Sequence, residues 1–318
     1  MILALDIGGT QFGLALATAR GKIVRRIQRR TDQRGGARWM VEQLLKESAS
    51  LLARSPKPVS VCGIGFGGPV NFAAQRIVNS THITGWDNYR LPDVIERELG
   101  IPAIVDNDAN VGALGEYTFG AGVGCRNMVY YTVSTGIGGG IIIDGLIYRG
   151  GNGNAGEFGH APILLNGPRC ICGNRGCLEI LCSGTAIGKR GEALAKKFPR
   201  RGHLLRLLSN GEQITAKVVF DAARRGDPLG RHIVGETATY LGMSVATTMN
   251  TIAPDLIVIG GGVSQAGRIL FEPLRREADR FLMPIHRKSL KVVPAKLKGL
   301  SVILGAVVLA KNYEAKKK

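Results

Sequence analysis

The chain has 318 residues, 45% of them hydrophobic and 21% charged, which indicates a globular protein with room for two domains. No run approaches the roughly 20 apolar residues that span a bilayer, and the N-terminus lacks a secretory leader, so we expect a cytoplasmic protein without a membrane contact. The formal net charge of +18 would suit nucleic acid or polyphosphate. The basic runs (21–30, 195–206 and 286–291) lack the regular aromatic residues of a single-strand binder, so we expect a solvated basic surface with no specific nucleic-acid partner.

The first third of the chain predicts an α/β unit. Apolar segments at 1–8 and 11–18 predict two strands joined by a glycine turn, and 23–30 predicts a third strand. An amphipathic helix over 38–54, a buried strand over 59–68 and a helix closed by Gly100 follow. The segment 101–105 predicts the next strand, and the residues after it suit the start of a helix.

The same order of elements then begins again. Residues 127–150 predict strand, glycine turn and strand, so that DIGGTQFGLAL and STGIGGGIIID form an approximate internal repeat. Helices are predicted over 178–198, 215–225 and 228–252, then a strand at 255–262, a helix from Gly267 and a last helix through 307–313. Two related α/β halves predict two lobes around a central cleft. We expect a smaller lobe of residues 1–116 plus 303–318, and a larger lobe of residues 117–302 that carries the cysteine cluster.

Three glycine runs each follow an apolar strand. Turns rich in glycine expose backbone N–H groups that suit phosphate oxygens, and Asp6, at the end of the first strand, is placed to hold Mg²⁺. The alternative is that these are ordinary turns, but their recurrence within a repeated pattern favours nucleotide binding. The residues concerned are Gly8, Gly9, Thr10, Thr135, Gly136, Gly261 and Gly262.

Four residues that favour helix N-caps are crowded where the strand at 101–105 passes into a helix: Asp106, Asn107, Asp108 and Asn110. One cap would satisfy the helix. A carboxylate at this point of the fold would also suit a general base that takes a proton from a substrate hydroxyl during phosphoryl transfer. The spacing leaves Asp106 and Asp108 as equal candidates.

Three of the six cysteines fall within eight residues, at Cys170, Cys172 and Cys177. Glycine turns between them allow the three sulfur atoms to converge, and a tetrahedral zinc site needs one further ligand. His160 suits that role better than Cys182, which is expected on a helix and facing away. Reduced core cysteines are the alternative, yet such cysteines seldom lie among Gly, Asn and Arg, so we predict structural Zn²⁺.

Two carboxylates flank the predicted zinc ligands. Glu157 precedes His160 by three residues, and Glu179 follows Cys177 by two. A zinc site with four protein ligands has no open position for catalysis, so we expect the metal to hold this loop in shape. Carboxylates without a cationic partner suit the hydroxyl groups of a neutral polyol, which donate hydrogen bonds to them.

These motifs together resemble the ROK family of repressors, open-reading-frame products and kinases. The similarity rests on DIGGT, NDAN, STGIGGG, E-x-G-H and C-x-C-G-x-x-G-C-x-E in this order, and it runs from Ala4 to about Gly262 with a matching C-terminal helix. The resemblance implies a two-lobed actin-like ATPase (ribonuclease H-like) fold. It also implies transfer of the γ-phosphoryl group of MgATP to the 6-hydroxyl of a hexose, most often glucose, by a homodimer or homotetramer.

Specific roles follow from the resemblance. Asp108 matches the catalytic base, and the matching sugar contacts are Gly68, Asn88, Asn107, Glu157, His160 and Glu179. The glycine turns match the ATP site, in which Gln11 stands where many members have Lys or Asn, so one of the neighbouring basic residues would have to supply the cation. Fructose, mannose, N-acetylglucosamine and N-acetylmannosamine are alternative substrates, and polyphosphate is an alternative donor. A sugar sensor without activity is the alternative from another class. Family repressors carry an N-terminal winged helix, whereas this sequence starts on the first strand, so we do not expect a DNA-binding repressor.

Overall fold

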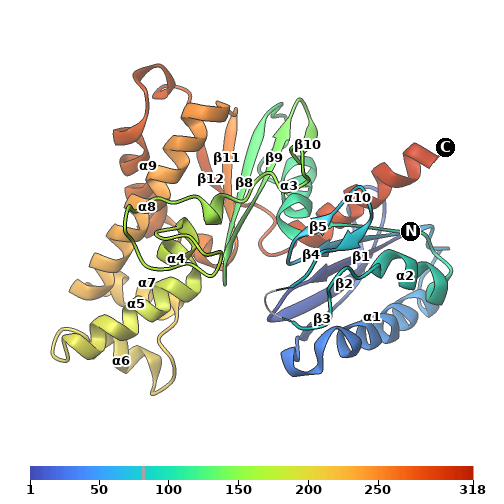
Figure 1. Ribbon diagram of the computed structural model, residues 1–318, viewed down its shortest axis with the longest axis horizontal. Helices are drawn as coiled ribbons and strands as arrows, with labels where there is room; N and C mark the ends of the chain where they lie inside the picture. The colour runs from blue at the N-terminus through green and yellow to red at the C-terminus, as the bar shows by residue number, and fades with distance from the viewer. Residues whose placement is uncertain (81–82, 318) are drawn as a thin grey trace. The chain divides into compact units, whose positions relative to one another are not determined.

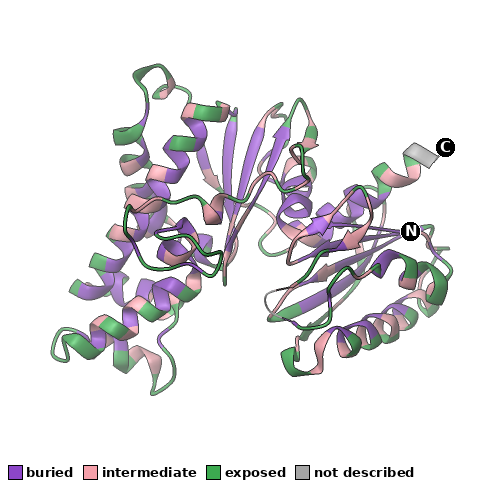
Figure 2. Cartoon of the chain, viewed as in Figure 1, coloured by how far each residue is buried: buried purple, intermediate pink, exposed green. Residues whose placement is uncertain are grey.

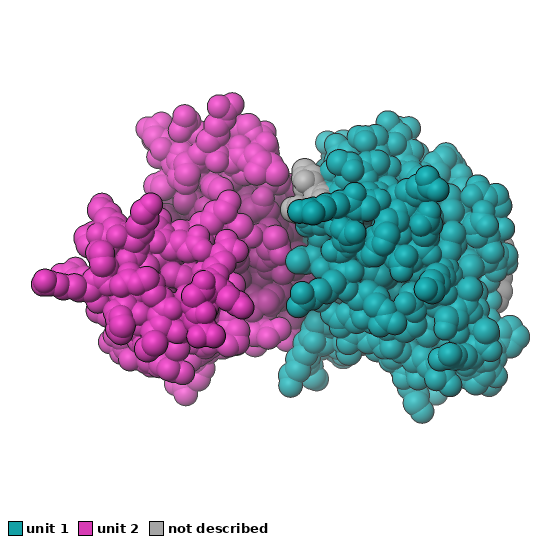
Figure 3. Space-filling view, turned by 90° about the horizontal axis from the view of Figure 1, so that it is seen from below, with its two compact units in different colours: residues 1–124, 140–156, 296–318 teal, residues 125–139, 157–295 magenta. Residues whose placement is uncertain are grey.

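The computed structural model describes residues 1–80 and 83–317, which form two compact units (Figure 1, Figure 3). The first unit comprises Met1–Gly124, Gly140–Gly156 and Lys296–Lys318, and the second comprises Cys125–Gly139 and Glu157–Ala295. Residues 117–124, 140–156 and 296–302 thus lie in the first unit, whereas the sequence placed them in the larger lobe. None of the helices that the structure describes has the length and apolar character of a membrane-spanning segment.

The first unit is built on a five-stranded sheet with the order β3-β2-β1-β4-β7. Its strands are β1 (Ile2–Ile7), β2 (Gln11–Ala17), β3 (Ile23–Arg30), β4 (Val61–Phe66) and β7 (Ala103–Asn107). Strands β1, β2 and β3 run antiparallel, while β1, β4 and β7 run parallel. Because helices cover both faces, β1 and β4 are buried along nearly their whole length, whereas β3 is an exposed edge (Figure 2).

Different helices cover the two faces of this sheet. Helices α1 (Gly36–Ala53) and α2 (Leu91–Leu99) pack on the face that buries Leu3, Leu5 and Ile7. Helices α3 (Asp108–Phe119) and α10 (Ser301–Lys317) pack against each other and against β4 on the opposite face. Since side chains alternate along a strand, Asp6 lies on the face of α3 and α10.

Glycines allow α10 to lie directly on its neighbours. A Cβ atom at Gly305 would lie 1.6 Å from the carbonyl oxygen of Val111 in α3, and one at Gly63 would lie 2.0 Å from that of Ala306. No side chain fits in either place, so these glycines set the depth at which α10 packs. The C-terminal helix was predicted over 307–313 and in fact begins six residues earlier, at Ser301.

The second sheet has the order β10-β9-β8-β11-β12, and the boundary between the units falls within β9. Its strands are β8 (Met128–Val133), β9 (Ile137–Ile143), β10 (Leu146–Tyr148), β11 (Leu256–Gly260) and β12 (Val292–Pro294). The second unit also contains α6 (His203–Ser209), α7 (Ala216–Arg224), α8 (Pro228–Ile252) and α9 (Arg268–Phe281). Each sheet therefore holds a strand pair joined by a glycine turn beside parallel strands, as the internal repeat predicted.

The helix predicted over 178–198 is two helices, α4 (Leu178–Cys182) and α5 (Gly184–Lys197). Ser183 separates them in an extended conformation, and its hydroxyl caps α5 by accepting from the Ala186 N–H at 3.1 Å. The break brings the N–H of Gly184 within 2.6 Å of the Ser134 carbonyl oxygen, where a Cβ at Gly184 would lie 2.8 Å from that atom. The helix is thus interrupted at Ser183, and Gly184 instead contacts the second glycine turn at Ser134. The short pair β5 (Val70–Asn71) and β6 (Arg76–Ile77), with β10, β12 and α6, was not predicted.

Candidate active site

The first glycine turn, between β1 and β2, is held from the segment that follows β3. The Gly8 N–H donates to the Gln11 carbonyl oxygen at 3.1 Å, and a Cβ at Gly8 would lie 2.9 Å from that oxygen. Thr31 secures both sides of the turn, since its hydroxyl donates to Gly8 O at 2.9 Å and its N–H donates to Thr10 O at 3.0 Å. The turn is therefore built on backbone contacts, and Thr10 and Gln11 remain exposed.

Two carboxylates come together beside this turn. Asp6 lies near the end of β1, and Asp108 is the first residue of α3. Burial and then the Asp108 charge raise the pKa of Asp6 to about 7, while the Arg26 charge opposes this rise. A Cβ at Gly67 would lie 3.4 Å from Oδ2 of Asp108, so the loop after β4 also closes on this carboxylate. Two close carboxylates, one of them costly to ionise, form a donor set that suits Mg²⁺ held directly or through water.

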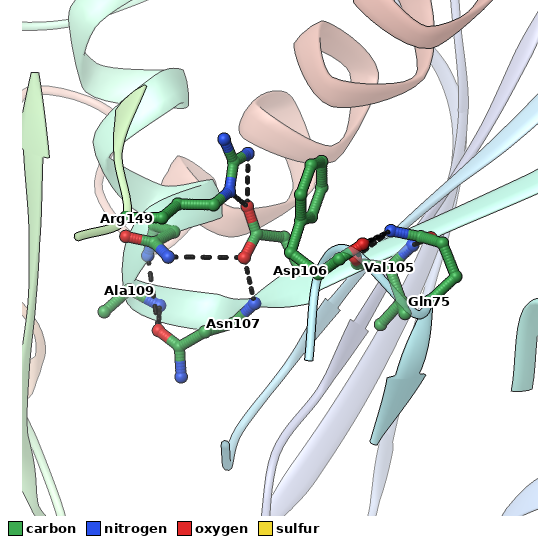
Figure 4. A network of polar contacts seen from close by, with 8 residues as sticks. Gln75, Val105, Asp106, Asn107, Ala109 and Arg149 are labelled. Atoms are coloured by element: carbon green, nitrogen blue, oxygen red, sulfur yellow. Dashed lines mark hydrogen bonds and ion pairs between the residues drawn. The ribbon is translucent and has the colours of Figure 1, made fainter. Parts of the chain in front are cut away.

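The structure distinguishes the two aspartates that the sequence left open, and Figure 4 shows the contacts of one of them, Asp106. Asp106 is 1% exposed, and its Oδ2 accepts from both Nε and Nη2 of Arg149, at 3.0 and 2.7 Å. Its Oδ1 accepts from the Asn107 N–H at 2.8 Å and from Asn110 Nδ2 at 3.2 Å. Burial raises the pKa of Asp106, and the Arg149 ion pair counteracts that rise. With both oxygens engaged inside the protein, Asp106 supports structure, and Asp108 is the better candidate for a base.

Asn107 connects this helix to the loop after β4. Its Oδ1 accepts from the N–H groups of Ala109 and Asn110, at 2.9 and 3.3 Å, which makes it the N-cap of α3. Its Nδ2 donates to the Gly68 carbonyl oxygen at 3.0 Å. Asn88 lies in the segment before α2, exposed and with a left-handed backbone (φ 52°), where its N–H donates to Val78 O at 3.0 Å. Asn107, Gly68 and Asp108 are thus brought together, and Asn88 belongs to the same unit.

In the second unit, Glu157, His160 and Glu179 interact. Partial desolvation raises the pKa of Glu157, the His160 charge lowers it, and the charge of Glu179 raises it, so both groups lie within electrostatic range of Glu157. The Glu179 carboxylate also contacts the second glycine turn: its Oε2 accepts from the Ile137 N–H at 2.8 Å. A Cβ at Gly136 would lie 2.5 Å from the same oxygen. Glu179 therefore joins the predicted sugar contacts to the predicted phosphate turn.

The third glycine run lies against the end of β8. Gly261 has φ +80°, and a Cβ there would lie 2.3 Å from the Val133 carbonyl oxygen, so this position requires glycine. Val133 directly precedes the second turn, in which the Ser134 N–H donates to Gly136 O at 2.8 Å. Thr135, Gly136, Gly261 and Gly262 are thus carried by two neighbouring strand ends, β8 and β11.

The four predicted zinc ligands converge. One donor atom from each of His160, Cys170, Cys172 and Cys177 lies within 4.8 Å of all the others. Nδ1 of His160 is 3.7 Å from the Cys170 sulfur, and the sulfur atoms of Cys172 and Cys177 are 3.6 Å apart. In a tetrahedral site with Zn–S bonds of about 2.3 Å, neighbouring sulfur atoms lie about 3.8 Å apart, so the donor set fits zinc.

Backbone contacts within the loop hold these four residues close together. The Cys170 N–H donates to Asn174 O at 2.8 Å, and a Cβ at Gly176 would lie 1.8 Å from the Leu164 carbonyl oxygen. Cys182 is buried on α4, where its sulfur donates to Thr237 O at 3.7 Å, so it is no ligand, as predicted. Because Nδ1 of His160 faces the sulfur atoms, its Nε2 remains for a different partner.

Comparison with known proteins agrees with this geometry. The ROK family model matches residues 2–313 of the chain. The chain belongs to the ROK family. It is 33% identical to a glucokinase of Thermotoga maritima over 98% of this chain and 97% of that protein. It is 32% identical to a xylose repressor of Caldicellulosiruptor bescii, over 84% of this chain and 66% of the repressor. A ROK family glucokinase from Streptomyces griseus, solved in complex with glucose and AMPPNP, superposes with a TM-score of 0.87 at 32% identity, over 98% of this chain and 99% of that one.

The predicted family and the predicted two-lobed, actin-like α/β fold are therefore confirmed. The sequence reasoning missed Arg149, the partner of Asp106 in this ROK chain. A buried aspartate at the end of an apolar strand needs a cation, and that signal was present in the sequence. The choice of Arg149 among 42 basic residues needed the tertiary structure.

Proposed function

We propose that the chain is an ATP-dependent hexose kinase, which transfers the γ-phosphoryl group of MgATP to the 6-hydroxyl of a hexose, with glucose as the preferred substrate. The observation that carries this proposal is the state of the two aspartates at the start of α3. Asp106 is neutralised by Arg149, while Asp108 stands beside Gly67 and within the field of Asp6.

Asp108 is proposed as the general base. A carboxylate in the first turn of a helix is stabilised by the N-terminal end of the helix dipole, which favours its ionised form. In that form it accepts the proton of the sugar hydroxyl as the hydroxyl oxygen attacks the phosphorus atom. Asn107 fixes the base in place, because it caps the same helix and holds the loop at Gly68.

The glycine turns are proposed to hold the donor. The backbone N–H groups of Gly9 and Gly136 and the hydroxyls of Thr10 and Thr135 suit phosphate oxygens, while the Gly8 N–H is used within the turn. The glycines at Gly261 and Gly262 allow close approach of a nucleoside. MgATP, when bound, supplies the phosphoryl group together with a cation that neutralises its developing charge. Asp6 would hold that cation, which would also relieve its repulsion with Asp108.

Three side chains of the segment that carries the cysteine cluster are proposed as sugar contacts. Glu157 and Glu179 would accept hydrogen bonds from hydroxyl groups, and Nε2 of His160 would contact the sugar while Nδ1 binds zinc. Asn88, Asn107 and Gly68 are proposed as further contacts. The four protein ligands leave zinc no open position, so we assign it the structural role of holding the loop between His160 and Glu179.

Glucose is proposed because the Streptomyces griseus relative was solved with glucose and AMPPNP and the Thermotoga maritima relative is a glucokinase. Mannose, fructose and the two N-acetylhexosamines remain alternative substrates within the family. The family resemblance further favours a homodimer or homotetramer. Zinc thiolates suit a reducing compartment, which supports a cytoplasmic location.

A coupled ADP-release assay with MgATP against glucose, fructose, mannose, N-acetylglucosamine and N-acetylmannosamine tests this proposal. We expect turnover of glucose above the others, and a loss of at least ~10²-fold in kcat for Asp108→Asn. Asp93→Asn, which removes an exposed carboxylate from α2, is the matched control and should keep the wild-type rate. If glucose binds but no sugar is phosphorylated, the chain is a sugar sensor, a role that its similarity to a xylose repressor would accommodate.

A further inference from the structure

The edge strand β3 presents two chemically different faces. On the face of α1, Ile27 packs against the core and Nε of Arg29 pairs with Glu47 of α1 at 3.0 Å. Because side chains alternate along the strand, Arg26, Gln28 and Arg30 lie on the opposite face, which is the face of Asp6. Two of the four arginines of β3, Arg26 and Arg30, thus lie on the same face of the sheet as Asp6.

A line of polar side chains connects Arg26 to that turn. Nη2 of Arg26 donates to Oε1 of Gln28 at 2.9 Å, and Nε2 of Gln28 donates to Oε1 of Gln11 at 2.6 Å. Gln11 directly follows Thr10 and is paired in the sheet with Arg30. The two amides fix the direction of the Arg26 guanidinium.

Only small residues of β2 lie between Arg26 and Asp6. Asp6, Gly13 and Gln28 are register partners across β1, β2 and β3, while Arg26, two residues before Gln28, is paired with Ala15. A Cβ at Gly13 would lie 3.8 Å from the Ile303 side chain of α10, which covers this part of the face. The Arg26 charge lowers the pKa of Asp6, which places the guanidinium within the field of this carboxylate. The partner that Arg26 does have is a neutral amide, whereas Arg29 on the other face is neutralised by Glu47. A guanidinium held by an amide retains its charge for an anion.

We infer that Arg26 binds the terminal phosphates of the phosphoryl donor and supplies the cation that the turn itself lacks. This inference rests on the proposed kinase function and adds a phosphate-binding residue to it. Gln28 and Gln11 position Arg26, and Asp6 holds the opposite charge that orients the bound metal–phosphate group. A guanidinium offers planar N–H donors to phosphate oxygens, and a contact made with the terminal phosphates is missing when the ligand is a nucleoside monophosphate.

The test compares Arg26→Gln and Arg26→Lys with Arg29→Gln, a matched control from the other face of the same strand. Affinities for MgATP and for AMP are measured by calorimetry, and the KM values for MgATP and for sugar are measured by steady-state kinetics. We expect Arg26→Gln to weaken MgATP binding and raise its KM by ~10-fold, with AMP affinity and sugar KM unchanged, because only the terminal phosphates lose a charged contact. Arg26→Lys should recover part of this loss, and Arg29→Gln should match the wild type.

The inference is overturned if Arg26→Gln leaves the ratio of MgATP to AMP affinity at its wild-type value, or if Arg29→Gln lowers that ratio equally. A general loss of structure would weaken AMP and MgATP binding together, and this result also speaks against a specific phosphate contact. The binding measurement needs no turnover. If the wild type phosphorylates no sugar, the proposed function fails, while the affinity ratio still decides the role of Arg26.

Discussion

Replacing Asp6 with asparagine should stabilise the unliganded protein while removing a ligand of the proposed metal site. Asp6 lies between the sheet and the helices α3 and α10, where burial and the neighbouring Asp108 charge both oppose its ionisation. Asparagine has nearly the same shape and carries no charge. The substitution therefore removes the unfavourable ionisation without opening a cavity.

The magnitude follows from the pKa of Asp6, which rises from 3.8 to about 7 on folding. Between these values the folded protein binds more protons at this position than the unfolded chain does, so the free energy of unfolding falls as the pH rises through that interval. Each pKa unit corresponds to about 1.4 kcal/mol, which limits the penalty above pH 7 to about 4 kcal/mol. Because the carboxylate is partly exposed to water, we expect Asp6→Asn to gain about 1–3 kcal/mol at pH 8.

Urea unfolding of the wild type and Asp6→Asn at pH 8 and at pH 4.5, without magnesium or nucleotide, measures this gain. The advantage of the variant should be largest at pH 8 and mostly lost at pH 4.5, where folded Asp6 is already protonated. Asp93→Asn, at an exposed position, should show no such dependence on pH. Equal stability of Asp6→Asn and wild type at pH 8, or an advantage that does not change with pH, would refute the argument that Asp6 is held in a repulsive site.

Three further predictions concern the supports of the site. Arg149→Met should lower the free energy of unfolding by about 3–5 kcal/mol, because the Asp106 carboxylate is left buried without a cation. Adding Asp106→Asn should recover most of this loss. If urea unfolding shows Arg149→Met to be as stable as the wild type, the prediction is wrong. Cys172→Ser should release about one zinc ion per chain, measured by metal analysis, and should raise the KM for sugar more than that for MgATP. A variant with the same zinc content as the wild type would exclude a zinc site at this cysteine cluster. Glu179→Gln keeps an acceptor for the Ile137 N–H but loses the charge. The KM for sugar should therefore rise ~10-fold in steady-state kinetics, with the KM for MgATP nearly constant. A rise in the KM for MgATP with a constant KM for sugar would assign Glu179 to the phosphate turn alone.

Local patterns in the sequence were sufficient for much of this structure. Four residues that spacing alone predicted to converge, His160, Cys170, Cys172 and Cys177, do come together, because they lie within a short segment whose glycines permit tight turns. The strand–turn–strand repeat was equally clear, because apolar strands and glycine turns both depend on residues that are neighbours in the sequence. That Cys182 faces away from the cysteine cluster also followed from its predicted place on a helix.

Features that depend on distant partners were beyond the sequence. The choice between Asp106 and Asp108 required Arg149, which directly follows β10, and β10 packs against α3. The helix predicted over 178–198 breaks at Ser183 because Gly184 docks on Ser134, a contact across 50 residues that no helical periodicity contains. The boundaries of the two compact units also depend on distant partners, because packing decides which segments of the chain belong to which unit.

The central claim is that this chain transfers phosphate to the 6-hydroxyl of a hexose with Asp108 as the base. Phosphorus-31 NMR of a reaction with glucose and MgATP tests it most directly, with wild type and Asp108→Asn followed in parallel. We predict the resonance of glucose 6-phosphate to appear with the wild type and to form at least ~10²-fold more slowly with the variant. The absence of any sugar phosphate with the wild type, or equal rates for the two proteins, would contradict the claim.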